Sequence, residues 1–207
     1  VREAHDTPRT WAKRGVRCII MYPMNALVSD QLSRLRRLMG DGEGRFVKHF
    51  RTCAGEKVRR PQFGMYTGRT PYPGTTPKGD QDKDLARTLK RVVDADGNTY
   101  IGELKKQGRI PAKADLSAFV EHLECGRHKT DPEDAELITR FEMQAVTPDI
   151  LITNYSMLEY MLFRPHERGI WNDTRAWLEA SPKNHLLFVI DEAHMYKGAS
   201  GGEVALL

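Results

Sequence analysis

The most informative segment for the fold is Leu186-Leu187-Phe188-Val189-Ile190-Asp191-Glu192-Ala193-His194. Five apolar residues, 186–190, are followed directly by two adjacent carboxylates. A continuous apolar run of this length is typical of a strand buried on both faces, as in a parallel sheet flanked by helices. Ligands of open α/β sheets bind at the carboxyl ends of the strands. The stretch therefore predicts a buried strand with a polar site at its end.

Three further segments predict strands, at Val16–Tyr22, Gln62–Thr67 and Asp149–Thr153. The first and the last of these are, like 186–190, nearly continuous apolar runs, which again favours strands buried on both faces. Segments with helical spacing lie between them. This alternation of strands and helices predicts an α/β fold with a parallel sheet flanked by helices.

Two predicted helices follow strand ends. Apolar residues recur every three to four positions over 27–39, so one side of this helix is expected to pack on the sheet, with Asn25 as its N-cap and Gly40 at its end. Asn154 is expected to cap a second helix, which Pro165 stops. The side chains expected to point inward are Leu27, Val28, Gln31, Leu32, Leu35, Leu38, Met39, Met157, Leu158, Met161 and Leu162. The arginines expected on the solvent side are Arg34, Arg36 and Arg37.

The middle of the chain, residues 71–147, does not show this alternation of strands and helices. It opens on the proline- and glycine-rich stretch Pro71–Gly79, which predicts a loop. No later segment of it reads as a strand of the core sheet, and helices are expected near 82–93, 115–124 and 132–144. We therefore predict one α/β domain in two pieces, 1–70 and 148–207, separated by a partly helical surface insertion at 71–147.

The composition is that of a globular chain of 207 residues, 40% hydrophobic and 29% charged. These values exclude a disordered or collagen-like chain. No apolar run reaches the roughly 18 residues that indicate a membrane span, and the first residues lack the pattern of a signal peptide. Because the chain begins without Met and ends inside an apolar run, we expect it to be a piece of a longer protein.

The net charge of +4 is unevenly distributed. Residues 1–70 carry 15 Lys and Arg against 6 Asp and Glu, a balance of +9, whereas residues 71–207 carry 17 against 22, a balance of −5. A basic half indicates either a polyanionic partner such as nucleic acid or a solvated face. The acidic residues of 71–147 favour a protein partner for the insertion over DNA.

The three cysteines, Cys18, Cys53 and Cys125, are an odd number and form no CxxC pair. This pattern indicates a reducing compartment, so the expected location is the cytoplasm. Cys125-x-x-His128, with His122 nearby, has the spacing of half a metal site. A zinc site is not expected, because no second pair with ligand spacing follows.

Asp191 and Glu192 are the candidate catalytic residues. A carboxylate at a strand end can hold Mg²⁺, usually through water, beside the phosphates of a nucleotide. The next carboxylate can orient or deprotonate the attacking water. The ring of His194 can link this phosphate site to whatever lies above the sheet. A strand that merely ends in a charged turn is the alternative, and it explains the combined pattern of 186–194 less well.

Asp191-Glu192-Ala193-His194 resembles motif II, the Walker B motif, of the DEAD/DEAH-box superfamily 2 helicases. Three earlier segments resemble the nucleic-acid motifs of these enzymes in the same order along the chain. They are Tyr22–Leu27 with Asp30-Gln31, which resembles motif Ia, Tyr66–Thr70, and Pro148–Asn154, which resembles motif Ib. The chain departs from the family at Thr153-Asn154, where many members have Thr-Thr or Thr-Pro.

The resemblance covers about 16–70 and 146–207 and implies the first RecA-like domain of an ATP-dependent helicase, a P-loop NTPase fold, incomplete at both ends. It implies ATP and Mg²⁺ as cofactors, with Asp191 holding Mg²⁺ through water and Glu192 and His194 in catalysis. The residues implied at the nucleic acid are Pro23, Met24, Asn25, Ala26, Leu27, Gln31, Gly68, Arg69, Thr70, Thr153 and Asn154. Two strand-to-helix turns, at Asn25 and Asn154, offer helix N-termini that would hold phosphates without reading bases. Taken singly, both are also ordinary helix caps.

The segments Asn154–Leu162 and Asp191–Ala199 resemble a bacterial subgroup more narrowly. That subgroup holds the large DEAH helicases with a C-terminal region of the DUF1998 type, including a mitomycin-repair helicase and the DISARM phage-defence helicase. Within this subgroup, the segment Tyr66–Gly74 favours a resemblance to the phage-defence helicase. DNA is the preferred substrate on this resemblance alone.

The phosphate loop of such an enzyme is not found in the chain. Gly64–Thr70 has three residues between its glycines and an Arg before Thr70, whereas a P-loop has four and a Lys. The chain also stops before a second RecA-like domain with its arginine finger. We therefore expect the 207 residues alone neither to bind ATP tightly nor to hydrolyse it. Two alternatives stay open for the whole protein, which are a nucleic-acid-binding scaffold with a degenerate ATPase and an RNA helicase.

Overall fold

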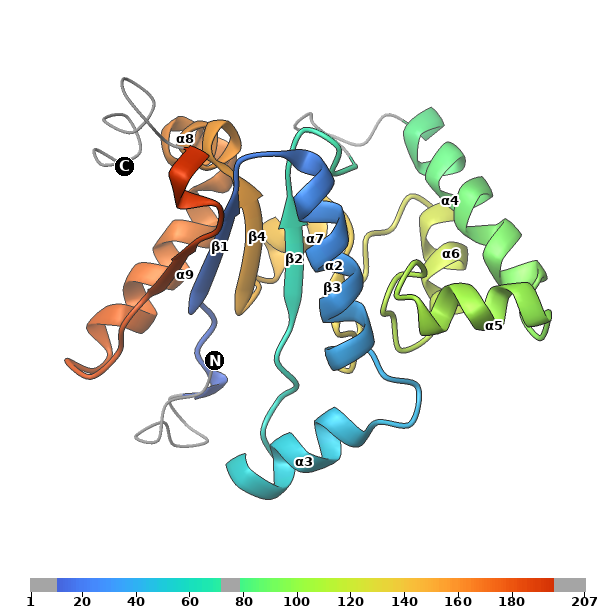
Figure 1. Ribbon diagram of the computed structural model, residues 1–207, viewed down its shortest axis with the longest axis horizontal. Coiled ribbons are helices and arrows are strands. Elements are labelled where there is room, and N and C mark those ends of the chain that lie inside the picture. Colours follow the sequence, from blue (N-terminus) through green and yellow to red (C-terminus); the bar gives the residue numbers. More distant parts are fainter. Residues whose placement is uncertain (1–10, 72–78, 196–207) are drawn as a thin grey trace.

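A computed structural model of the protein describes residues 11–71 and 79–195, with side chains from Asp82 onward in the second range. Within these residues five strands form one parallel sheet in the order β3-β2-β4-β1-β5 (Figure 1). The strands are β1 (Cys18–Tyr22), β2 (Phe63–Tyr66), β3 (Glu136–Leu137), β4 (Ile150–Asn154) and β5 (Leu187–Ile190). The α/β class and four of the strands agree with the sequence prediction.

Helices cover both faces of the sheet. Figure 1 shows α2 in front of the strands, with α7, α8 and α9 behind them and α3 below. The helices are α2 (Asn25–Met39), α3 (Arg45–Ala54), α4 (Gly79–Asp94), α5 (Thr99–Lys106), α6 (Leu116–Glu124), α7 (Arg140–Ala145), α8 (Tyr155–Phe163) and α9 (Arg168–Glu179), with short 3₁₀ turns η1 (Pro165–Glu167) and η2 (Ala193–Met195). Of these, α3, α5 and α9 were not predicted. None of the described helices is long and apolar enough to cross a membrane.

Alternation along the strands divides the core into two layers. Ile150 and Ile152 pack with Val28 and Leu32 of α2. Leu151, which lies between them in β4, packs instead with α8 and α9 on the opposite face. The apolar runs of β1 and β4 are therefore buried on both faces, as their sequences predict.

The same prediction is wrong for β5. All four of its residues are exposed, from 37% at Ile190 to 58% at Leu187. The reason is position, because β5 is the outermost strand and pairs only with β1 among the described strands. Within the described residues the helices pack on β4 and β1 instead.

Two expectations for the insertion are also wrong. The chain returns to the sheet at β3, where Glu136 and Leu137 pair with β2, although no sheet strand was expected there. The helix expected over 132–144 is shorter than predicted and consists of α7 only. It begins at Arg140, directly after a capping box. The Thr139 side chain accepts the N–H of Glu142, and the Glu142 carboxylate accepts the N–H of Thr139.

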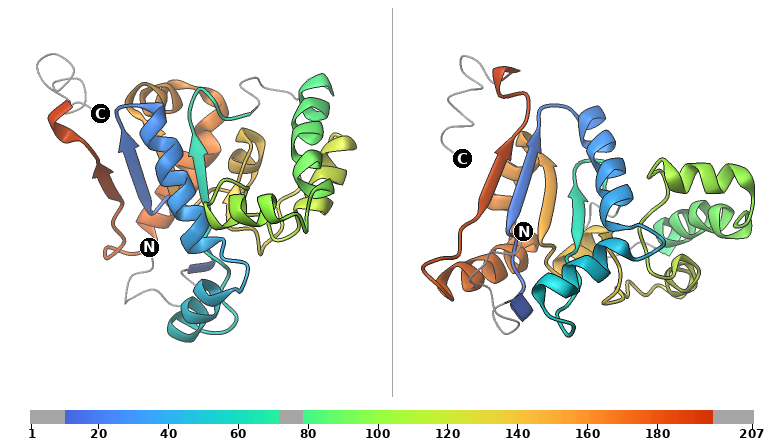
Figure 2. Two further views of the ribbon diagram at one scale, coloured as in Figure 1. Left: turned by 45° about the vertical axis from the view of Figure 1, so that its right-hand side comes forward. Right: turned by 60° about the horizontal axis from the view of Figure 1, so that its bottom comes forward.

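The insertion has a small core of its own, in which Ala86 and Leu89 of α4 pack against Phe119, Val120 and Leu123 of α6. This unit lies beside the sheet beyond β3, as the two views of Figure 2 also show. The insertion is therefore built as a helical layer next to the sheet.

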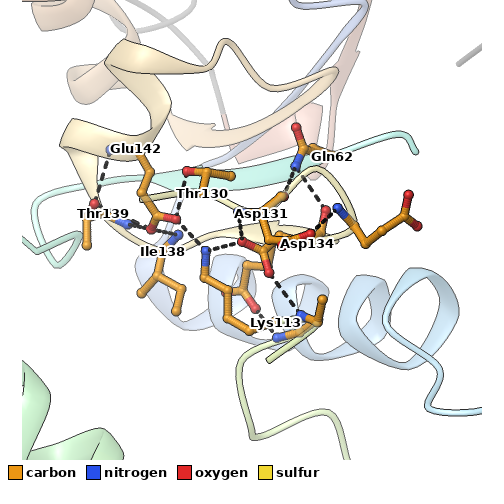
Figure 3. A network of polar contacts seen from close by, with 12 residues as sticks. Gln62, Lys113, Thr130, Asp131, Asp134, Ile138, Thr139 and Glu142 are labelled. Carbon is orange, nitrogen blue, oxygen red and sulfur yellow. Dashed lines mark hydrogen bonds and ion pairs between the residues drawn. The ribbon is translucent and has the colours of Figure 1, made fainter. Parts of the chain in front are cut away.

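Buried charges fasten the insertion to the sheet (Figure 3). The Lys113 side chain is fully buried, and its Nζ forms ion pairs with Glu142 and, at 3.0 Å, with Oδ2 of Asp134. The other Asp134 oxygen accepts the N–H of Ala114. Because both carboxylates belong to the segment around β3, Lys113 ties the loop before α6 to the edge of the sheet.

A second attachment joins the insertion to α2. Glu136 of β3 accepts two hydrogen bonds from Arg36, at 2.6 and 2.7 Å, and one from the N–H of Ala112. Gly108 has φ +69°, and a Cβ there would collide with the carbonyl of Ser33, so glycine lets the chain approach α2 closely. The expectation that Arg36 faces solvent is therefore wrong, because a carboxylate 100 residues away draws it inward.

Two leucines expected to point inward are exposed, Leu38 at 60% and Leu162 at 46%. Leu38 comes directly before the buried Met39, and Leu162 comes directly after the buried Met161. One position turns a helix by about 100°, which carries the leucine off the packed face. The apolar stripe predicted from the sequence is thus wider than the face that the sheet covers.

Candidate functional site

Parallel register brings the ends of β5, β1, β4 and β2 to one edge of the sheet. Ile190 pairs with Met21, Tyr22 with Asn154, and Thr153 with Tyr66. The N–H of Asp191 donates to the carbonyl of Met21 at 3.0 Å, which continues the pairing past the end of β5. The acidic turn, both strand-to-helix turns and the turn after β2 therefore share one edge.

The acidic turn after β5 has an unusual backbone. Glu192 has φ 51°, the one positive value among the described non-glycine residues. Its N–H donates to Oδ1 of Asp191 at 2.9 Å, and its carboxylate lies 3.2 Å from Nδ1 of His194. Left-handed conformations of non-glycine residues cluster at functional sites. Within the turn, Glu192 thus contacts both of the other residues predicted for catalysis, Asp191 and His194.

The carboxylate of Asp191 has one oxygen that is not used within the turn. Asp191 is half-buried, and among the described residues its Oδ2 takes no hydrogen bond. Burial, and next the charge of Asp191, raise the pKa of the neighbouring Tyr22 hydroxyl. Mg²⁺ is commonly held by one or two carboxylates together with water and substrate phosphates. Asp191 could supply such a carboxylate, and Glu192 stands beside it.

The two strand-to-helix turns are joined by their asparagines. The amide Nδ2 of Asn154 donates to Oδ1 of Asn25 at 2.9 Å, while Oδ1 of Asn154 accepts the N–H of Met157 at 2.9 Å. The prediction that Asn154 caps its helix is confirmed. The prediction for Asn25 is wrong, because Met24 is the N-cap of α2 and the Asn25 side chain makes no capping bond. Asn25 instead fixes the spacing between the two turns.

The other residues predicted around α2 fall into two groups. Pro23, Met24 and Ala26 are at least partly exposed at the turn itself, and Leu27 is half-buried behind them. Gln31 lies six residues into α2 from Asn25, about 9 Å along the helix axis at 1.5 Å per residue. Gln31 is therefore not at the edge where the turn lies.

The turn after β2 is closed by its own hydroxyls. Thr70 Oγ1 donates to the carbonyl of Met65 at 2.7 Å and accepts the N–H of Thr67 at 2.9 Å. Thr70 is 2% exposed, whereas Gly68 and Arg69 are exposed at the tip. Thr70 was expected to contact nucleic acid through its hydroxyl, and this expectation is not met because the hydroxyl is used inside the turn.

Thr153 is likewise internal. It is fully buried, and its Oγ1 donates to the carbonyl of Tyr66 at 2.7 Å. The bond links β4 to β2 just before their ends, so its hydroxyl is not available to a ligand. Of the residues predicted at this turn, Asn154 is the one that reaches the edge.

One residue that sequence reasoning missed reaches the turn from the insertion. Nη2 of Arg140, the first residue of α7, donates to the carbonyl of Thr67 at 2.9 Å. No local pattern could have found it, because the partners are 73 positions apart. Lys197 and the glycine-rich segment 198–202 lie outside the described residues.

The asparagine link can be measured as stability. We expect Asn154→Ala to lower the free energy of unfolding by about 1 kcal/mol for the lost N-cap, and further for the lost bond to Asn25. Asn98→Ala is the matched control, because Asn98 caps α5 through one bond to Tyr100 N–H, also at 2.9 Å, without a second partner. Urea unfolding curves of both variants give the difference. Equal losses in the two variants would mean that the bond to Asn25 contributes nothing.

Comparison with known proteins gives one informative match. Over 228 aligned positions the chain is 44% identical to the Druantia protein DruE of Escherichia coli (strain UMEA 4076-1). The alignment takes in 99% of this chain but spans only 12% of that protein. No protein-family model matches the chain, and no solved structure matches it significantly. The match thus relates nearly all of this chain to one segment of a much larger protein.

Proposed function

We propose that the chain is part of an ATP-dependent DNA helicase or translocase and forms most of its first RecA-like domain. The observation that carries this proposal is the single edge at which Asp191 and Glu192 adjoin the turns after β1, β4 and β2. An enzyme that couples hydrolysis to movement needs a phosphate site and a polymer site on one rigid body. Here both would be anchored to neighbouring strands of one sheet.

In this proposal Asp191 helps to hold Mg²⁺ beside the nucleotide phosphates, which neutralises the charge that develops during phosphoryl transfer. Glu192 orients the attacking water and accepts its proton. To do so its carboxylate turns away from His194, which lies 3.2 Å from it. The Walker A lysine and the arginine finger would come from other parts of the longer protein.

The nucleic acid would lie across the turns of Pro23–Leu27, Gly68-Arg69 and Asn154. Helix N-termini at α2 and α8 offer N–H groups to phosphates, and Arg69 adds an exposed charge. The side-chain amides of Asn25 and Asn154 bond to each other and to the backbone, so they are not free to read bases. Contacts of this kind hold a polymer without sequence preference, as movement along it requires.

The test is the ATPase activity of the full-length protein. We expect single-stranded DNA to raise kcat for ATP hydrolysis clearly above the rate without nucleic acid. Stimulation by RNA and not by DNA would favour an RNA helicase, because backbone contacts alone do not separate the two. ATPase activity absent with both polymers, together with retained DNA binding, would favour a scaffold with a degenerate ATPase.

We further propose that the full-length protein acts in antiviral defence, in a complex with other proteins. The support is the similarity to a Druantia protein over nearly the whole chain, together with the motif resemblance to a phage-defence helicase. Loss of phage resistance in cells that carry Glu192→Gln in an otherwise intact gene set would support the assignment.

A further inference from the structure

The turn after β2 is held from outside by a buried arginine. Arg140 is 3% exposed, and its Nη2 donates to the carbonyl of Thr67 at 2.9 Å. Its backbone N–H donates to the carbonyl of Pro71 at 3.3 Å, so one residue contacts both ends of the turn. The N–H of Arg69 donates to Oγ1 of Thr67, which connects the clamped residue to the exposed arginine at the tip.

The described contacts of the Arg140 guanidinium are with a backbone carbonyl and an aromatic ring. Among the described residues it forms no ion pair, and its buried Nε has no hydrogen-bond partner. Its guanidinium carbon lies 5.0 Å from the centre of the Tyr66 ring, whose hydroxyl donates to Glu167 at 2.6 Å. Arg17 is buried to the same degree, at 2% exposure, but forms an ion pair with Asp149 at 2.7 Å.

A buried charge without an ion-pair partner, as Arg140 is among the described residues, costs free energy that a neutral side chain of similar size would not cost. Fold stability alone therefore explains Arg140 poorly. A positive charge beneath the turn is useful if an anion binds above it, where Gly68 and Arg69 are exposed. The counter-charge of Arg140 would then be a phosphate on the other side of the turn, and not a carboxylate of the protein.

We propose that Arg140 is a positioning residue for nucleic-acid binding, which fixes the Thr67–Thr70 turn so that Arg69 meets a phosphate. This inference rests on the proposed nucleic-acid edge. It also gives the insertion a role at that edge. Arg140 follows directly on Thr139, which shares the capping box with Glu142, and Glu142 pairs with the buried Lys113 of the insertion.

The experiment is a double-mutant cycle in the full-length protein without nucleotide. Binding of a fluorescent single-stranded DNA is titrated at several salt concentrations for Arg69→Gln, Arg140→Met and the double variant. We expect each single variant to weaken binding at 0.1 M salt by about ten-fold and to lower the salt slope by about one phosphate contact. The double variant should bind no more weakly than either single one, because Arg140 acts through Arg69.

Arg17→Met is the matched control, since it removes an equally buried arginine at the opposite end of the sheet. It should lower the melting temperature but leave the salt slope unchanged. Should Arg140→Met fold poorly by its melting curve, Arg140→Gln, which is polar but uncharged, replaces it in the cycle, and non-additivity decides in the same way.

The proposal would be overturned if the loss of DNA affinity in the double variant equalled the product of the two single losses. It would also be overturned if Arg140→Met bound DNA as tightly as the unchanged protein does. Normal binding by Arg69→Gln would instead remove the nucleic-acid edge on which the proposal rests. The two failures are therefore distinguishable.

Discussion

Glu192→Gln in the full-length protein is expected to lower the nucleic-acid-stimulated rate of ATP hydrolysis by about 100-fold or more while ATP binding is retained. The amide keeps the size and one acceptor oxygen of the side chain but cannot take a proton from water. Asp191, which would hold the magnesium ion, is untouched. Binding should survive for that reason, and the loss should lie in kcat rather than in KM.

A matched control for this variant is Glu179→Gln. Glu179 is an exposed carboxylate at the end of α9, and its one ion pair among the described residues is with Arg175 at 2.8 Å. The Glu179→Gln substitution should leave the nucleic-acid-stimulated rate of ATP hydrolysis unchanged. Unchanged turnover in Glu192→Gln would contradict the role of this carboxylate, whatever the control shows.

Asp149→Ala is expected to destabilise the fold by about 3–5 kcal/mol, the range for breaking a buried ion pair. Asp149 is fully buried just before β4 and accepts hydrogen bonds from two arginines. Arg17 donates at 2.7 Å and Arg59 donates twice at 2.6 Å, and the N–H of Gln62 donates at 3.0 Å. Without the carboxylate, the buried Arg17 and the partly buried Arg59 lose the one acidic partner that they have among the described residues.

The guanidinium groups of both arginines also pack on the ring of Trp11. Their central carbons lie 4.3 Å (Arg17) and 4.6 Å (Arg59) from the ring centre, and this packing opposes their movement into solvent. Urea or thermal unfolding measures the effect. Asp84→Ala is the control, because Asp84 forms an exposed pair with Arg87 at 3.0 Å within one helix turn, and it should cost at most about 0.5 kcal/mol. A similar small loss for Asp149→Ala would contradict the buried network.

The sequence predicted those features that depend on neighbours along the chain. The apolar runs of β1 and β4, the alternation with helices and the cap at Asn154 follow from local patterns, and the structure has them. The stretch 186–190 forms a strand too, but its burial depends on what lies beside it. An apolar run specifies a strand and not its place in the sheet.

The remaining features depend on contacts between distant residues. Glu136 and Leu137 are too short a segment to carry a strand pattern, and they pair because Arg36, Lys113 and the capping box place them next to β2. Asn25 looks like a cap in the sequence but lies within reach of Asn154, 129 positions away. Hydroxyls of Thr70 and Thr153 look available in a motif and are used inside the fold.

We propose that nucleotide and nucleic acid meet at one edge of this sheet. The most direct measurement is a structure of the full-length protein with single-stranded DNA and a magnesium complex of a non-hydrolysable ATP analogue. We predict the ion beside Asp191 and DNA phosphates over the turns at Pro23–Leu27, Arg69 and Asn154. DNA bound away from these turns, or nucleotide phosphates remote from Asp191 and Glu192, would contradict the account.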